Sequence, residues 1–272
     1  GSLMFGPIMV ALMNIMPVHQ VLFLLAGVYG TMIFAASFVV APPPENMFKN
    51  DSTEAVMPKG VLTNLSAKEA LGTVRFYLLW VMLFINITCG ISLISVASPI
   101  SQEMGGLSVI QAASLVGMMG LFNGFGRIFW ASASDFIGRS QTFILFFSFQ
   151  ICAYFLLTVI GTPLLFKMLI LLIMTCYGGG FAVLPAFISD LFGFKQLSTI
   201  HGYVLTAWGM AGLVGPTLIT QILKITGKYE TTLLILSGAM IVALCTALTM
   251  FMQVKKLRND YRSDSYQVTK GG

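Results

Sequence analysis

Long apolar runs separated by short polar segments make up most of the chain. A helix needs about 20 apolar residues to cross the ~30 Å hydrocarbon core of a bilayer, and most of the runs approach this length. The pattern therefore predicts an all-α polytopic membrane protein with about eight transmembrane helices. The runs are Leu3–Met16, Val21–Val40, Phe76–Val96, Leu107–Ser134, Gln141–Ile160, Leu164–Phe187, Thr199–Leu223 and Thr231–Gln253.

The composition supports this class, since 57% of the 272 residues are hydrophobic and only 9% are charged. Such a chain has too little polar surface to cover a soluble globule. The net charge of +5 comes from scattered Lys and Arg rather than a basic face, so no nucleic-acid partner is expected. Each cysteine lies alone in its own run, without metal-site or disulfide spacing, and is predicted to be a small core residue: Cys89, Cys152, Cys176 and Cys245.

Polar segments divide the chain into four predicted regions. Residues 1–40 form a helical hairpin with His19 in its connection, residues 41–74 form a hydrophilic linker, residues 75–254 hold six helices, and 255–272 form a disordered polar tail. Ser66 and Glu69 have the spacing of a capping box, which predicts a helix that begins near Ser66 and enters the membrane around Phe76.

Positive residues predict the orientation, because Lys and Arg are retained on the cytoplasmic side. Assigning loops alternately to the two sides puts most cations together with the linker and the tail, which are therefore predicted to be cytoplasmic. One side holds Lys49, Lys59, Lys68, Arg75, Arg139, Lys195, Lys255, Lys256, Arg258, Arg262 and Lys270, and the other holds Lys167, Lys224 and Lys228.

Arg127 is the residue of greatest functional interest. It is the only formal charge between Glu103 and Asp135, and an arginine within a spanning helix costs at least a few kcal/mol unless it faces a cavity or a partner. Asn123 lies one turn away on the same face, and Gly117, Gly120 and Gly124 are expected to bring a neighbouring backbone close. The alternative is that the Arg127 side chain reaches toward the lipid headgroups.

A charged turn follows the same helix. Asp135 lies eight residues beyond Arg127, about 12 Å along the axis, so the two cannot form a direct salt bridge. Gly138 suits a left-handed helix stop, and Arg139 opens the next helix. We interpret Ser134–Arg139 as a charged hinge between two helices, although a solvated helix end also accounts for isolated charges.

The stretch Gly126-Arg127 followed by Trp130-Ala-Ser-Ala-Ser-Asp-Phe-Ile-Gly-Arg139 resembles the inter-helix loop signature of the major facilitator superfamily. The segments Phe76–Trp80, Ile94–Pro99 and Leu121–Arg127 resemble the oxalate/formate antiporter family within it. The resemblance implies a twelve-helix fold, of which this chain is expected to be the last eight helices. It is therefore expected to lack four helices and not to transport by itself.

The resemblance also implies a site. In the oxalate carriers of the family, an arginine of this helix and a lysine of the eleventh helix together hold a dianion; Arg127 matches the first, whereas Trp208 stands at the position of the second. One fixed cation suits a monoanion better, because a second carboxylate would be buried without a partner.

Further candidate residues lie on the following helices. Tyr177 and Phe181, one turn apart, are candidates for the cavity or else core or lipid-facing aromatics, and Pro185 can break their helix near a moving segment. Asn123 and Asn86 each fit interhelical hydrogen bonds better than a ligand role, and Asn123 is kept as a candidate ligand. His201 is expected in the interface, with a proton-shuttle role as the alternative. Two groups of glycines are predicted packing or bending points: Gly178, Gly179 and Gly180, and Gly209 with Gly212.

The sequence thus predicts a transporter of small carboxylates, of the formate, lactate or pyruvate class, that works by alternating access. Arg127, Asn123, Trp208, Tyr177 and Phe181 would bind substrate, and Asp135, Gly138 and Arg139 would form a gate. Proton symport and anion exchange stay open, as do oxalate/formate-type exchange and a non-transporting carboxylate sensor.

No enzyme motif, metal site or cofactor is predicted. The expected setting is the bacterial inner membrane, with the lipid bilayer, a carboxylate, a proton and the missing helices as partners, and a monomer when full length.

Overall fold

The computed structural model describes residues 8, 11–39 and 61–268, and it divides the chain into two units, Gly1–Lys59 and Gly60–Gly272. In the first unit, α2 spans Val18–Ser37 and begins directly after Pro17. The prediction that His19 lies in a connection is therefore wrong, because the fixed φ of Pro17 starts the helix and His19 falls in its first turn. Most of the predicted Leu3–Met16 helix and residues 41–60 of the predicted linker lie outside the described residues.

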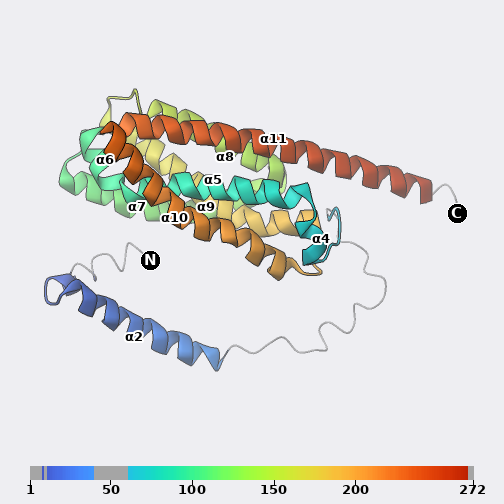
Figure 1. Cartoon of the computed structure of the whole chain (residues 1–272), viewed down its shortest axis with the longest axis horizontal. Helices are drawn as coiled ribbons and strands as arrows, with labels where there is room; N and C mark the ends of the chain where they lie inside the picture. The colour runs from blue at the N-terminus through green and yellow to red at the C-terminus, as the bar shows by residue number, and fades with distance from the viewer. Residues whose placement is uncertain (1–7, 9–10, 40–60, 269–272) are drawn as a thin grey trace. The chain divides into compact units, whose positions relative to one another are not determined.

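The second unit is a helical bundle, and its long helices follow the predicted runs with shifted boundaries (Figure 1). α6 was not predicted, since its seven residues fall between two apolar runs and include Pro99. The helices are α4 (Ala67–Leu71), α5 (Val74–Ser95), α6 (Ala97–Glu103), α7 (Val109–Ile137), α8 (Arg139–Leu156), α9 (Pro163–Phe192), α10 (Leu197–Thr226) and α11 (Tyr229–Val268).

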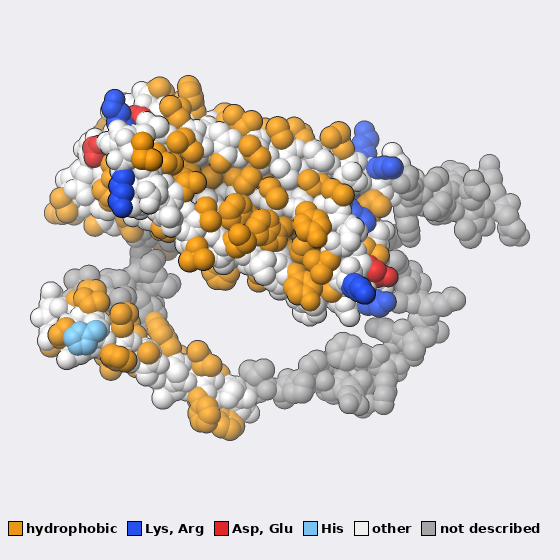
Figure 2. Space-filling model, viewed as in Figure 1, with side chains coloured by type: hydrophobic (Ala, Val, Ile, Leu, Met, Phe, Trp, Pro, Cys, Tyr) orange, Lys and Arg blue, Asp and Glu red, His pale blue; other side chains and the backbone are white. Residues whose placement is uncertain are grey.

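Six described helices are long and apolar enough to cross a membrane: α2, α5, α7, α9, α10 and α11 as far as Asn259. α8 packs in the bundle as well but is shorter and carries Arg139, Gln141 and Gln150, which lower its hydropathy. The chain is therefore a multi-pass membrane protein. Figure 2 shows Lys and Arg side chains gathered at the two ends of the bundle, with apolar side chains over the middle.

The central helix of the bundle is α9, most of which is buried. It packs closely on α7 and α8, while α10 packs on α5 and α11 on α8 and α5. Phenylalanines fill the space around α9, among them Phe143, Phe146 and Phe187, none of which is more than 2% exposed. α9 thus holds the surrounding helices in fixed positions.

Glycines set the spacing between α7 and α9. A Cβ added at Gly178 would lie 2.1 Å from the Asn123 carbonyl oxygen, and one at Gly126 would lie 2.3 Å from the Thr175 carbonyl oxygen. The predicted close packing at Gly178 to Gly180 is confirmed. For Gly117 and Gly124 the described residues give no such close packing: a Cβ at either position would have none of them within 4 Å, because both positions face away from α9.

Gly209 and Gly212 on α10 were predicted to be packing or bending points, and the described residues give no close packing there, since none lies within 4 Å of a Cβ at either position. α10 instead contains Pro216, which lacks the N–H that would bond to the carbonyl of Gly212. The prediction that all four cysteines are core residues is confirmed for Cys89 and Cys176, which are buried, and wrong for Cys152 and Cys245, which are exposed.

The capping box at the start of α4 is confirmed, with Glu69 accepting hydrogen bonds from the Ser66 backbone and hydroxyl at 2.7 Å. The helix ends after five residues, and α5 begins separately after the Thr73 cap. Just before α4, the backbone N–H groups of Leu62 and Leu65 each donate 2.8 Å hydrogen bonds to carbonyls at the end of α9. The end of the predicted linker is thus bonded to the bundle.

The prediction of a disordered tail from residue 255 is wrong as far as Val268, because α11 continues through it. No glycine or proline lies between Gly238 and Gly271, and Lys255, Lys256 and Arg258 are good helix formers. Figure 1 shows the end of α11 extending past the other helices of the bundle.

Candidate substrate-binding site and gate

Three helices each contribute a row of side chains to one cavity of about 340 Å³. The residues of each row are three or four positions apart, so they share one helix face. All five predicted substrate-binding residues are brought together here. The cavity is lined by Asn123 and Arg127 from α7, Tyr177 and Phe181 from α9, and His201, Leu205 and Trp208 from α10.

The α7 row is held against α9 by the Asn123–Gly178 contact described above. Among the described residues, the Asn123 Oδ1 atom is buried without a hydrogen-bond partner. No hydrogen bond among the described residues uses the amide nitrogen of Asn123, so this nitrogen can donate into the cavity that Asn123 lines. Asn123 therefore offers a neutral donor one helical turn from Arg127.

The guanidinium of Arg127 lies over the Phe181 ring, with 5.5 Å between the guanidinium carbon and the ring centroid. This cation–π contact holds the guanidinium beside the cavity that both residues line. Phe181 also packs edge-on against Tyr177 and Trp208, each at a centroid distance of 5.6 Å. An aromatic cluster centred on Phe181 thus joins all three helices around one cation.

Pro185 does not break its helix, because α9 continues through it to Phe192. Proline at this position removes the hydrogen bond to the carbonyl four residues earlier, which belongs to Phe181. The surrounding helices hold α9 in place despite that loss. The Phe181 cluster is thus built on a continuous helix with one missing backbone hydrogen bond.

The α10 row adds a residue that the sequence placed in the interface. His201 lines the cavity and is half-buried, four and seven residues before Leu205 and Trp208 on the same face. Of the described residues around the cavity, Arg127 is the one with a fixed charge. Trp208, at the position where the resemblance implied a lysine, is 50% exposed and closes one apolar side.

The predicted gate residues meet at the end of α7. Gly138 joins α7 to α8 with φ of +100°, a conformation that residues with a side chain rarely adopt. Arg139 forms an ion pair with Asp135 and donates hydrogen bonds to the Ser134 hydroxyl and to the Ala131 carbonyl. These contacts close the α7–α8 turn on itself.

Asp190 of α9 is a functional candidate that the sequence analysis missed. Its Oδ2 atom lies 3.7 Å from Arg139 Nε, so Arg139 joins the ends of three helices. The sequence signal that could have identified Asp190 is an acidic residue at the end of a long apolar run. Its partner Arg139, however, lies 51 residues away in the chain. A cavity of about 280 Å³ at this end is lined by Asp135, Arg139, Asp190 and Arg258, among others.

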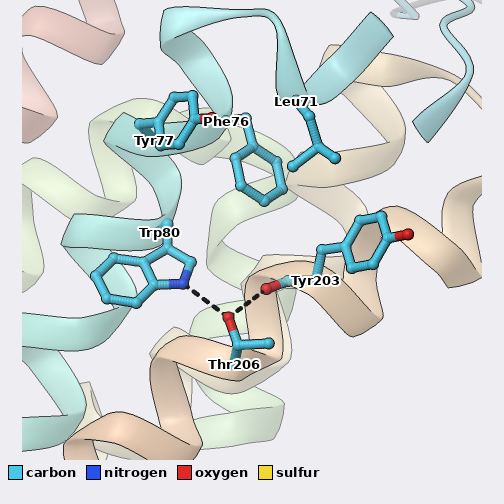
Figure 3. A pocket seen from close by; sticks show the side chains of 6 residues that line it. All are labelled: Leu71, Phe76, Tyr77, Trp80, Tyr203 and Thr206. Atoms are coloured by element: carbon cyan, nitrogen blue, oxygen red, sulfur yellow. Dashed lines mark hydrogen bonds between the residues drawn. The ribbon is translucent and has the colours of Figure 1, made fainter. Parts of the chain in front are cut away.

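A third cavity, of about 410 Å³, lies between α5 and α10 (Figure 3). Figure 3 shows the Trp80 indole nitrogen directed at the Thr206 hydroxyl, a 2.9 Å hydrogen bond, with aromatic rings around it. Its described lining carries no charge, so it lacks what a carboxylate requires. The lining residues are Leu71, Phe76, Tyr77, Trp80, Tyr203 and Thr206.

Comparison with known proteins places the chain among membrane transporters. It is 26% identical over 218 residues to the oxalate:formate antiporter of Oxalobacter formigenes. The matched segment covers 79% of this chain and 50% of that protein. It is also 25% identical over 148 residues to the uncharacterized MFS-type transporter YhjX of Escherichia coli (strain K12). That matched segment covers 53% of this chain and 36% of the transporter. The chain thus spans about half the length, or less, of these curated relatives.

A family model described as the Major Facilitator Superfamily matches residues 1–216, and so includes parts of both units. The match covers more than half of the chain. Together with the apolar helices and the loop signature at Asp135–Arg139, it confirms the resemblance noted in the sequence: the chain belongs to the Major Facilitator Superfamily.

Proposed function

We propose that this chain is part of a secondary active transporter of small carboxylates that works by alternating access, with the Arg127 cavity as its substrate site. The observation that carries the proposal is the convergence of one fixed cation, one amide donor and an aromatic cluster on a single cavity. The similarity to an oxalate:formate antiporter supports the same class of substrate.

The chemistry of the cavity suits a small monocarboxylate. A guanidinium can donate two parallel hydrogen bonds to the two oxygens of one carboxylate, and the Asn123 amide can donate a third. The rings of Phe181 and Trp208 would cover the apolar side of the substrate. A volume of about 340 Å³ is near the lower end for ligand cavities, which favours formate, lactate or pyruvate over larger acids.

The proposed gate is the charged junction of α7, α8 and α9. Arg139 can hold the three helix ends together only while it contacts both Asp135 and Asp190. Motion of one helix relative to the others would break one contact and open a path to the cavity. We place this end, with the linker and the tail, on the cytoplasmic side of a bacterial inner membrane, following the distribution of Lys and Arg.

The test of the site is direct binding of radiolabelled formate, lactate and pyruvate to the purified chain in detergent. Arg127→Lys keeps the charge but loses the paired geometry, and should weaken binding by about tenfold, the effect of losing one charge-assisted hydrogen bond. Arg127→Gln should abolish binding. Lys224→Gln, which removes an exposed cation at the far end of α10, is the matched control and should bind normally. Normal binding by Arg127→Gln would reject the proposed site.

Counterflow of labelled carboxylate in proteoliposomes distinguishes the modes of the whole transporter. Anion exchange requires unlabelled carboxylate on the opposite side, whereas proton symport accumulates substrate in response to a proton gradient alone. A protein that binds carboxylate in detergent but supports neither process would instead fit a sensor with this fold.

A further inference from the structure

His201 gives the Arg127 cavity a second basic group that the proposed function does not use. It projects from α10 on the same face as Leu205 and Trp208, and lines the cavity together with Arg127 of α7. Seven residues separate it from Trp208, or about 10 Å along the helix, so it lies toward the first turns of α10. The cavity therefore has a permanent cation on one helix and a titratable base on another.

We propose that His201 is a specificity-determining residue of the carboxylate site, which in its protonated form supplies a second cation and makes the cavity accept a dicarboxylate. This inference rests on the proposed function of the Arg127 cavity. With His201 neutral, Arg127 is the one fixed charge and a second carboxylate would be left without a partner. With His201 protonated, a dianion has one cation for each carboxylate.

The other ionisable groups near α10 leave this role to His201. Tyr177 of α9 shares the cavity, but a phenol ionises only near pH 10 and stays neutral at physiological pH. The groups on α4 and α5 have contacts elsewhere: Glu69 is bonded to Ser66, Arg75 lies over Phe192 at 5.9 Å, and Tyr77 lines the cavity of Figure 3.

Three more sets of groups are not part of the described cavity lining. Lys68 is exposed on α4, Lys195 precedes α10, and α11 carries its charges near its two ends. On the part of α11 whose side chains the structure describes, as far as Asn259, these are Glu230, Lys255, Lys256 and Arg258. Imidazole is therefore the one group of the described lining that titrates between pH 5 and 8.

Lowering the pH should tighten the binding of both anions, and should tighten oxalate binding more than formate binding. Carboxylates are ionised above pH 5, so lowering the pH from 8 to 5.5 changes the charge of the imidazole and not that of formate or oxalate. Protonation adds a favourable Coulombic interaction with the bound anion, and that interaction doubles for a charge of −2. If formate binding tightens about tenfold over this range, oxalate binding should tighten about a hundredfold.

The experiment measures the dissociation constants of labelled formate and oxalate for the detergent-purified chain from pH 5.5 to 8. In His201→Gln the pH dependence of binding should disappear for both anions. His201→Lys, whose charge is permanent over this range, should bind oxalate tightly at pH 8. The chain contains two histidines, so His19→Gln on α2 is the matched control and should keep the full pH dependence.

The outcomes separate this inference from the proposed function. Loss of formate binding in Arg127→Gln, together with an unchanged pH dependence in His201→Gln, would overturn the role of His201 and leave the carboxylate site standing. Normal formate binding in Arg127→Gln would reject the site and this inference with it. An equal tightening of formate and oxalate at low pH would also overturn the role of His201, because two cations must favour the dianion.

Discussion

The contact between α7 and α9 predicts a large effect from one added methyl group. In Gly178→Ala the new Cβ would lie 2.1 Å from the Asn123 carbonyl oxygen and 2.6 Å from its side-chain oxygen, whereas ordinary contacts begin near 3.4 Å. The first of these atoms is backbone and cannot rotate away, so the two helices must separate by about 1 Å. Such overpacking costs about 1–3 kcal/mol, which exceeds the gain of up to about 1 kcal/mol from replacing a helical glycine by alanine.

Separation of α7 from α9 also moves Arg127 relative to Phe181, because the two residues lie on the two separated helices. A misplacement of about 1 Å can cost up to a hundredfold in a positioned site. We therefore expect Gly178→Ala to lower the midpoint of thermal unfolding in detergent by a few degrees, at about 2–4 °C per kcal/mol for a chain of this size. Formate binding should weaken in the same variant.

The matched control is Gly124→Ala on α7, one residue from Asn123, where nothing lies within 4 Å of the added methyl group. This variant should unfold at the same temperature as the unmodified chain or slightly higher, and should bind formate normally. Unchanged stability and binding in Gly178→Ala would show that the α7–α9 spacing does not position Arg127, and would refute the reasoning.

Three further predictions concern polar groups outside the cavity. Asn86 accepts a 2.9 Å hydrogen bond from Gln150 in the buried bundle, so Asn86→Leu should cost about 1–3 kcal/mol by leaving Gln150 unpartnered, and the double variant with Gln150→Leu should recover part of that loss in unfolding measurements. Asp190→Asn should cost no more than about 1 kcal/mol because Asp190 is partly exposed, and a double-mutant cycle with Arg139→Gln on unfolding should give a coupling of that size. Arg139→Gln alone should cost more, because it also loses the ion pair with Asp135 and the hydrogen bond to Ser134. The hydrogen bonds that Glu69 accepts from Ser66, the residue capping α4, lower the pKa of its carboxyl. The stability that they contribute should therefore be present at neutral pH and lost as the pH falls through that pKa. A Glu69→Ala variant should lose less of its unfolding free energy on acidification than the unmodified chain does.

The residues that line the proposed substrate cavity were largely predictable because the information is local to each helix. Asn123 with Arg127, and Tyr177 with Phe181, share a face by their spacing alone, and an isolated arginine in an apolar run indicates a cavity. Trp208 came from resemblance and not from spacing. His201 was not predicted to line the cavity, because its position near a helix start also fits the membrane interface.

Contacts between distant parts of the chain were not predictable in the same way. Asp190 meets Arg139 only because α9 packs beside the α7–α8 turn, and Gly126 rather than Gly117 or Gly124 faces α9 because of the rotation of α7 about its axis. Periodicity places glycines on a helix face but does not say which face meets a neighbour.

The sequence by itself determined the membrane class, the long helices of the bundle, the capping box at Ser66 and the rows of side chains on each helix, since these depend on hydropathy and on bonds within a few residues. The tertiary structure alone decided that rows from α7, α9 and α10 meet at one cavity, that Phe181 lies between Arg127 and Trp208, and that His201 joins them. The physical reason is that helix formation is local, whereas the rotation and spacing of packed helices depend on side-chain fit across the whole bundle.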